Sequence, residues 1–93
     1  MKKQRFKSVW DAIENSADDA ANMKARSTLM IAISEHIRTR KLTQEQAARL
    51  FGVTQPRVSD LVRGKIERFT IDMLINMLTR AGIRVEIKVR TAA

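Results

Sequence analysis

The sequence predicts a mainly α-helical domain of five helices followed by a single C-terminal β-strand. Over most of the chain, apolar residues recur at spacings of three and four, which is typical of helices with one buried face. Polar cap residues open these stretches, and three glycines and one proline separate them. Only residues 83–90 alternate strictly, with an apolar residue at each odd position and a charged residue at each even one, which is typical of a half-buried strand.

The composition limits what this chain can be. Its 93 residues make one small domain, which leaves little room for a deep substrate cavity. It contains no cysteine and a single histidine, His36, so the usual zinc ligand sets are excluded and no cofactor is expected. No apolar run is long enough to cross a bilayer, and no signal-peptide pattern opens the chain, so we expect a cytoplasmic protein.

Capping patterns predict the first two helices. Ser8 with Asp11 resembles a capping box and indicates a short helix, and Ser16 with Asp19 repeats the pattern and indicates a long helix to about Arg38. The long helix carries an apolar stripe: Ala21, Ala25, Leu29, Ala32, Ile33 and Ile37. Residues expected to pack in or beside the core are His36, Met23, Met30, Met73 and Met77.

Three shorter helices are expected over residues 44–51, 55–63 and 70–80. Each is capped by a threonine and ends at a glycine, the caps being Thr43, Thr54 and Thr70 and the stops Gly52, Gly64 and Gly82. The chain then divides into a basic flexible tail (1–7), a helical domain (8–82) and a C-terminal strand (83–90).

The charge of the chain favours a polyanionic partner. Eighteen basic residues against ten acidic ones give a net charge of +8. Residues 37–68 hold most of the excess, with eight basic residues against three acidic ones. This concentration makes nucleic acid the first candidate partner.

Residues 43–64 have the pattern of a helix-turn-helix motif, in which two short helices meet at a tight turn. Ala47 and Ala48 are small enough for a close helix crossing, and Gly52 permits the turn. The outer face of the second helix is then free to enter the major groove of double-stranded DNA. The residues expected there are Gln55, Pro56, Arg57, Ser59 and Asp60.

The same segment resembles the DNA-binding core of XRE regulators, which are relatives of the phage Cro and cI repressors with a lambda-repressor-like fold. The resemblance rests on residues 42–48 (LTQEQAA), 51–61 (FGVTQPRVSDL) and 63–65 (RGK). Nearly the whole chain is similar to the HigA-like antitoxin subgroup, through residues 8–11 (SVWD), 24–25 (KA), 68–70 (RFT) and 82–87 (GIRVEI). Membership implies a repressor that neutralises a RelE/HigB-like toxin and represses the operon encoding both. The alternative is a stand-alone XRE or phage-type regulator without a toxin partner.

The resemblance also implies roles for single residues. Gln44 would bond a phosphate and brace the next glutamine, and Gln55 would read adenine through its amide. Arg57 could pair with guanine, while Pro56 departs from the polar residue frequent in phage relatives and leaves only contact with a thymine methyl. Phosphate contacts are implied for Arg63 and Lys65. The complete expected DNA-binding set is Gln44, Thr54, Gln55, Pro56, Arg57, Ser59, Asp60, Arg63 and Lys65.

The C-terminal segment predicts a homodimer. Helix-turn-helix proteins usually read the two half-sites of a palindromic operator as two-fold symmetric pairs. Antiparallel pairing of residues 83–90 with their own copy could supply the axis, centred on Ile87 or on Val85, because centring on Glu86 would place like charges opposite each other. Of these two positions for the axis, we prefer Ile87. The alternative to a dimer is that the segment adds a strand to the β-sheet of a toxin. The expected interface residues are Ile83, Val85, Glu86, Ile87, Lys88 and Val89.

Other classes of function find less support in the sequence. An enzyme would need a nucleophile with a base, a carboxylate pair or a metal cluster, and none is visible. RNA binding usually needs an aromatic platform, whereas the aromatic residues here are scattered. A pure protein-interaction module stays open and would show no steep dependence of DNA affinity on salt. The basic tail is expected to be disordered, with a minor-groove arm as the alternative.

Overall fold

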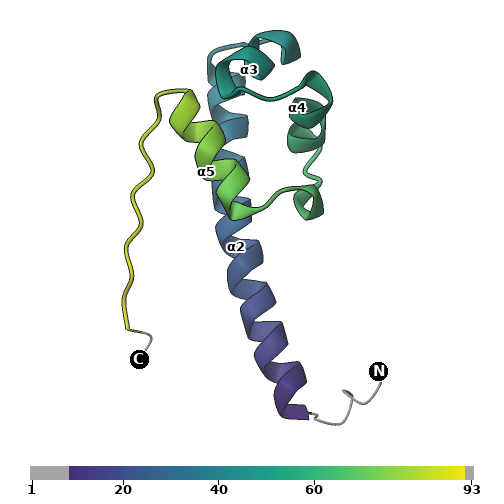
Figure 1. The fold of residues 1–93 in the computed structure, drawn as a ribbon, viewed down its shortest axis with the longest axis vertical. Helices are drawn as coiled ribbons and strands as arrows, with labels where there is room; N and C mark the ends of the chain where they lie inside the picture. The colour runs from purple at the N-terminus through teal and green to yellow at the C-terminus, as the bar shows by residue number, and fades with distance from the viewer. Residues whose placement is uncertain (1–8, 92–93) are drawn as a thin grey trace.

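The computed structural model describes residues 9–91, with side chains from residue 17 onward. In this part of the chain it has four α-helices and one 3₁₀ turn (Figure 1): α2 (Val9–Thr39), α3 (Gln44–Phe51), α4 (Gln55–Val62), η1 (Ile66–Arg68) and α5 (Ile71–Arg80). The expected basic tail and the Ser8 cap lie outside the described residues.

The first two expected helices are a single helix. α2 runs without interruption through Ser16 and Asp19, so the prediction of a break there, and with it of five helices, is wrong. No glycine or proline lies between residues 9 and 39, and alanine, the residue with the highest helix propensity, is frequent directly after Ser16, at positions 17, 20, 21 and 25. A serine with an aspartate three residues later therefore does not start a new helix where nothing ends the preceding one.

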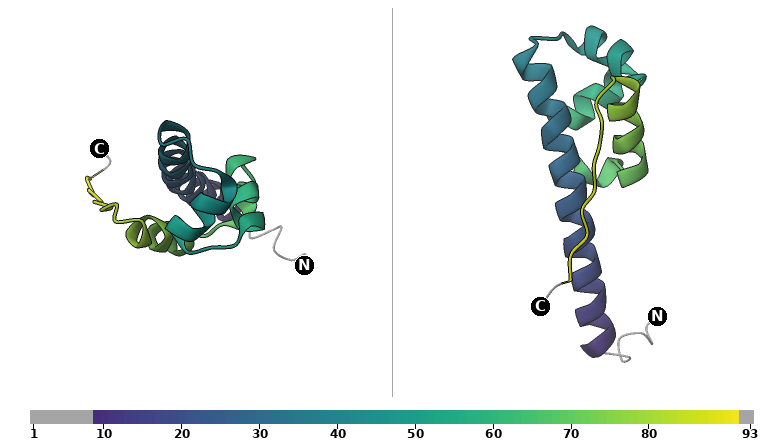
Figure 2. Two further views of the ribbon diagram at one scale, coloured as in Figure 1. Left: turned by 90° about the horizontal axis from the view of Figure 1, so that it is seen from above. Right: turned by 90° about the vertical axis from the view of Figure 1, so that its left-hand side faces the viewer.

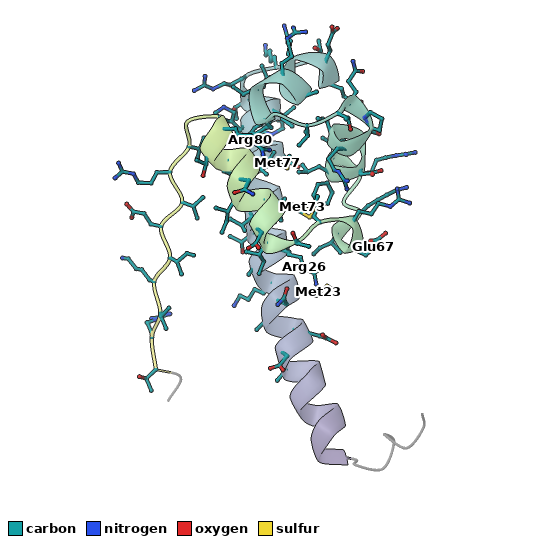
Figure 3. The ribbon with its side chains drawn as sticks, in the orientation of Figure 1. Met23, Arg26, Glu67, Met73, Met77 and Arg80 are labelled. Atoms are coloured by element: carbon teal, nitrogen blue, oxygen red, sulfur yellow. The ribbon has the colours of Figure 1, made fainter. Side chains whose placement is uncertain are left out.

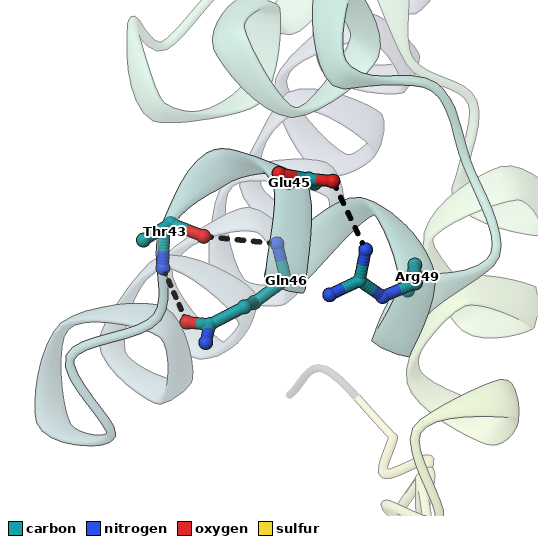
Figure 4. A network of polar contacts seen from close by, with 4 residues as sticks. All are labelled: Thr43, Glu45, Gln46 and Arg49. Atoms are coloured by element: carbon teal, nitrogen blue, oxygen red, sulfur yellow. Dashed lines mark hydrogen bonds and ion pairs between the residues drawn. The ribbon is translucent and has the colours of Figure 1, made fainter.

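The three shorter helices form where they were expected. α3 has the predicted bounds, and α4 ends at Val62, one residue before its predicted end. The capping box at the start of α3 is confirmed (Figure 4): the Gln46 N–H donates to the Thr43 hydroxyl at 3.1 Å, and the Thr43 N–H donates to Gln46 Oε1 at 2.9 Å. On the outside of α3, Arg49 pairs with Glu45 at 3.2 Å.

The core lies where the second half of α2 meets the shorter helices. α4 and α5 pack on α2, and α3 packs on α4 and α5 near the C-terminal end of α2 (Figures 1 and 2). The His36 ring stands edge-on to the buried Phe51 ring, with 6.0 Å between centroids, as expected for a packing role. Among the expected core methionines, Met30 and Met77 are buried, whereas Met23 is 46% exposed. The largest buried side chains are Phe51, Phe69, Ile33, Leu61, Leu74, Met77, Leu78 and Val58.

The first half of α2 extends beyond the rest of the domain (Figure 1). All side chains from Ala17 to Lys24 are exposed, which explains the exposure of Met23. The 31 residues of α2 span about 46 Å at the usual helical rise. The molecule is 49 Å long. The length of the molecule is therefore set by one helix, whose described side chains before Ala25 are exposed.

The C-terminal segment is extended but forms no strand. Residues 83–91 have no regular secondary structure, so the predicted C-terminal β-strand is wrong for the single chain. A strand requires a partner for its backbone, and no second strand exists within residues 9–91. At the start of the segment the alternation of apolar and charged residues still has an effect, because Ile83 and Val85 pack against the core. Further along, Ile87 and Val89 are 73% and 90% exposed.

Candidate nucleic-acid interface

The turn between α3 and α4 is built around Gly52. This residue is left-handed, with φ 70° and ψ 38°, and its N–H bonds the Ala48 carbonyl at the end of α3. The buried Ala47 and Ala48 let the helices approach, as expected, and Val58 and Leu61 anchor α4 from the other side. The two helices are thereby held at a fixed angle, and the outer face of α4 stays free.

The start of α4 presents polar side chains to solvent. Thr54 caps the helix, and its hydroxyl accepts a hydrogen bond from the Arg57 N–H at 3.3 Å. Gln55 is exposed and Ser59 is half-buried, and neither makes a side-chain hydrogen bond within the described part of the chain; the apolar ring of Pro56 is exposed between them. The polar atoms of Gln55 and Ser59 are therefore available to a ligand without any internal bond being broken.

Arg57 is oriented differently from its neighbours. Its guanidinium turns back to the segment that follows α4, where Nη1 donates to the Arg68 carbonyl at 3.0 Å. The same group lies over the ring of the buried Phe69, 5.6 Å from the ring centre. To contact a base, Arg57 would have to break its hydrogen bond to the Arg68 carbonyl and leave the Phe69 ring.

Asp60 would be an obstacle to DNA binding if it stood alone, because its carboxylate lies on the helix expected in the groove. Arg68 from η1 pairs with it at 3.3 Å, and the Asp60 side chain is only 17% exposed. The pair neutralises the carboxylate at the surface of α4. Arg63 is exposed and Lys65 half-exposed on the turn between α4 and η1.

Two arginines from different helices hold the η1 segment. Arg26 of α2 donates to the Ile66 and Phe69 carbonyls at 3.3 and 3.5 Å, and its buried Nε has no partner. Arg57 of α4 holds the Arg68 carbonyl. The loop that carries Lys65 is therefore fixed relative to both helices.

Sequence reasoning missed the residues that position this surface. Arg26 and Arg80 reach partners at least 28 residues away, and Arg68 reaches back from η1 to a residue of α4, so no spacing within one helix predicts these contacts. Arg80 of α5 covers the turn by donating to the Gly52 carbonyl at 3.4 Å. Gln44 is exposed at the start of α3, and no hydrogen bond joins it to Gln55 among the described contacts. The expected interface residues from Ile83 to Val89 lie on the C-terminal segment, apart from α4 (Figure 1).

The comparisons agree with this geometry. Residues 12–90 match the family model of a helix-turn-helix domain. A solved structure assigned to the XRE family of transcriptional regulators is 32% identical, covers 80% of this chain and 83% of its own, and superposes with a TM-score of 0.73. Comparison with curated proteins gives no significant match. The chain is thus a helix-turn-helix protein, and it belongs to the XRE family. Within residues 9–91, no helix combines the length and apolar character that crossing a membrane requires.

Proposed function

We propose that this DNA-binding transcriptional regulator is a sequence-specific repressor that inserts α4 into the major groove of duplex DNA. The observation that carries the proposal is the outer face of α4, where the exposed Gln55 and the half-buried Ser59 make no internal side-chain hydrogen bond and lie beside a basic turn. Gln55 and Ser59 are the proposed base readers, with Pro56 against a thymine methyl. Gln44, Arg63 and Lys65 are the proposed phosphate contacts.

The regulator is proposed to act as a homodimer on a palindromic operator. Half-sites about 34 Å apart require two copies of α4 related by a two-fold axis. Apart from the Ile83 N–H, which bonds the Leu78 carbonyl, the extended segment 83–90 offers unpaired backbone groups, and the side chains of Ile87 and Val89 are exposed. Antiparallel main-chain pairing with a second copy would satisfy the backbone and cover both side chains.

An antitoxin role is the finer proposal, and it derives from the HigA-like resemblance. The features that favour a protein partner are the projecting half of α2 and the exposed apolar residues of the C-terminal segment. A stand-alone regulator is the alternative, in which both features serve the dimer alone. A small basic RelE-like protein that is encoded beside the gene and copurifies with the chain would favour the antitoxin role. The antitoxin role would be contradicted if the chain did not alter the activity of that protein.

Selection from a library of random duplexes tests the DNA-binding proposal. A repressor of this kind enriches a palindrome, and its affinity falls steeply with salt because neutralised phosphates release counterions. A library that stays random after selection, or an affinity indifferent to salt, would contradict the proposal.

Sedimentation equilibrium tests the dimer separately. Removal of residues 83–93, or Ile87→Pro, should give a folded monomer with weakened operator binding. A truncated chain that remains dimeric and binds a palindrome cooperatively would show that the segment is not the dimer contact.

A further inference from the structure

A second basic site lies beside α4, on the side that faces α5. A cleft of about 310 Å³ opens between the helix-turn-helix turn and α5. Its lining residues are Val53, Thr54, Arg57, Met73, Asn76, Met77 and Arg80. Figure 3 shows Met73, Met77 and Arg80 in a row along α5. The cleft is distinct from the outward face of α4 assigned to base reading, because neither Gln55 nor Ser59 lines it.

Two arginines line the cleft, and no acidic residue does. Arg57 donates to the Arg68 carbonyl, and Arg80 donates to the Gly52 carbonyl. A carbonyl orients a guanidinium but carries no formal charge, and neither arginine has an acidic partner among residues 17–91. No carboxylate therefore offsets either charge, and most N–H donors of both arginines are left for a ligand.

The remaining polar groups of the cleft suit the same kind of ligand. Asn76 and Arg80 are four residues apart on α5, so their side chains share one face of the helix. Thr54 lines the cleft at the start of α4, whose first turn contains no acidic residue. The positive end of the α4 dipole is thus not offset by a local carboxylate and adds to the field of the arginines.

We propose that this cleft binds a phosphate group, with Arg57 and Arg80 as its charged ligands and Asn76 as a neutral donor. Planar guanidinium groups match phosphate oxygens in geometry and charge. The volume accommodates a phosphate together with several water molecules, each of which takes about 30 Å³ in the liquid. The phosphate belongs either to a DNA backbone that passes α5 or to a free phosphate-bearing small molecule.

Nuclear magnetic resonance with inorganic phosphate as the probe tests the site without DNA. At constant ionic strength, the backbone amide signals of Thr54, Asn76 and Arg80 should shift and saturate. The shifts should be lost in Arg80→Gln and in Asn76→Asp, which places a carboxylate in the cleft with almost no change of shape. Two control variants on α2, Lys24→Gln and Asn22→Asp, make the same charge changes outside the cleft and should retain them.

Asn76→Asp also gives a result if Arg80→Gln misfolds, because the Asn76 side chain is exposed and makes no hydrogen bond with another described residue. Shifts that never saturate, or that persist unchanged in folded Arg80→Gln and Asn76→Asp, would overturn the proposal. This readout is independent of operator recognition, so the phosphate site and the proposed repressor function can fail separately.

The salt dependence of binding to a random duplex then identifies the source of the phosphate. A DNA phosphate in the cleft predicts that Arg80→Gln reduces the slope of log K against log salt by about 0.9, while Lys24→Gln leaves it unchanged. If the phosphate belongs to a small molecule, Arg80→Gln should abolish the saturable shifts but leave the slope of log K against log salt unchanged. Both outcomes keep the cleft as a phosphate site.

Discussion

Gly52→Ala tests how the helix-turn-helix turn is built. At φ 70° an added Cβ strains the backbone, and the left-handed conformation costs an L-residue about 1–2 kcal/mol. The new Cβ would also lie 2.6 Å from Cδ of Arg80, so that side chain must move away and lose its hydrogen bond to the Gly52 carbonyl. An intramolecular hydrogen bond contributes about 0.5–1.5 kcal/mol, and an exposed one should lie at the low end. The expected total is about 2 kcal/mol.

Gly64→Ala is the matched control, because Gly64 has nearly the same φ of 74° but no atom within 4 Å of an added Cβ. It should cost only the backbone strain. Urea and thermal unfolding measure the difference, and in a domain of this size each kcal/mol lowers Tm by about 4–8 °C. In an Arg80→Ala background the two substitutions should cost the same. The reasoning is refuted if Gly52→Ala is no more destabilising than Gly64→Ala in the natural sequence, or if Arg80→Ala leaves their difference unchanged.

Two further predictions concern the basic turn after α4. Lys65→Ala should weaken binding to operator and random duplex alike and lower the salt slope by about one unit, because a phosphate contact carries no sequence information; a loss confined to the operator would contradict this. Arg68→Ala should weaken binding to any duplex more than Arg49→Ala does. It leaves the Asp60 carboxylate uncompensated on α4, whereas Arg49 pairs with a glutamate on the outside of α3. Equal losses in fluorescence anisotropy titrations would argue against this role of Arg68.

Local signals in the sequence predicted the helix-turn-helix motif well. A threonine cap, a reciprocal glutamine and a glycine stop act over three or four residues, so the bounds of α3 and the left-handed Gly52 could be derived from the sequence alone. The same reasoning failed at Ser16, because a cap pattern specifies a helix start only where the preceding helix has ended. It failed at the C-terminus as well, because alternation predicts an extended chain but cannot supply a backbone partner.

The positioning contacts of the candidate site could not be predicted from the sequence. Arg80 covers a turn that lies 28 residues earlier, and Arg26 holds carbonyls 40 and 43 residues later. Such contacts depend on how the helices pack, and an arginine in the sequence carries no sign of which carbonyl it will reach. Arg57 illustrates the consequence, since the family position indicated a base contact while its side chain bonds the Arg68 carbonyl in the folded chain.

The central claim is that α4 reads base edges through Gln55, and one comparison of affinities tests it most directly. Binding of natural protein and Gln55→Ala is measured on the selected operator and on a random duplex at one salt concentration, with Asn22→Ala, an exposed position on α2, as a control. We predict that Gln55→Ala loses about 1–3 kcal/mol on the operator and almost nothing on the random duplex. An equal loss on both duplexes, or no loss on either, would contradict the claim.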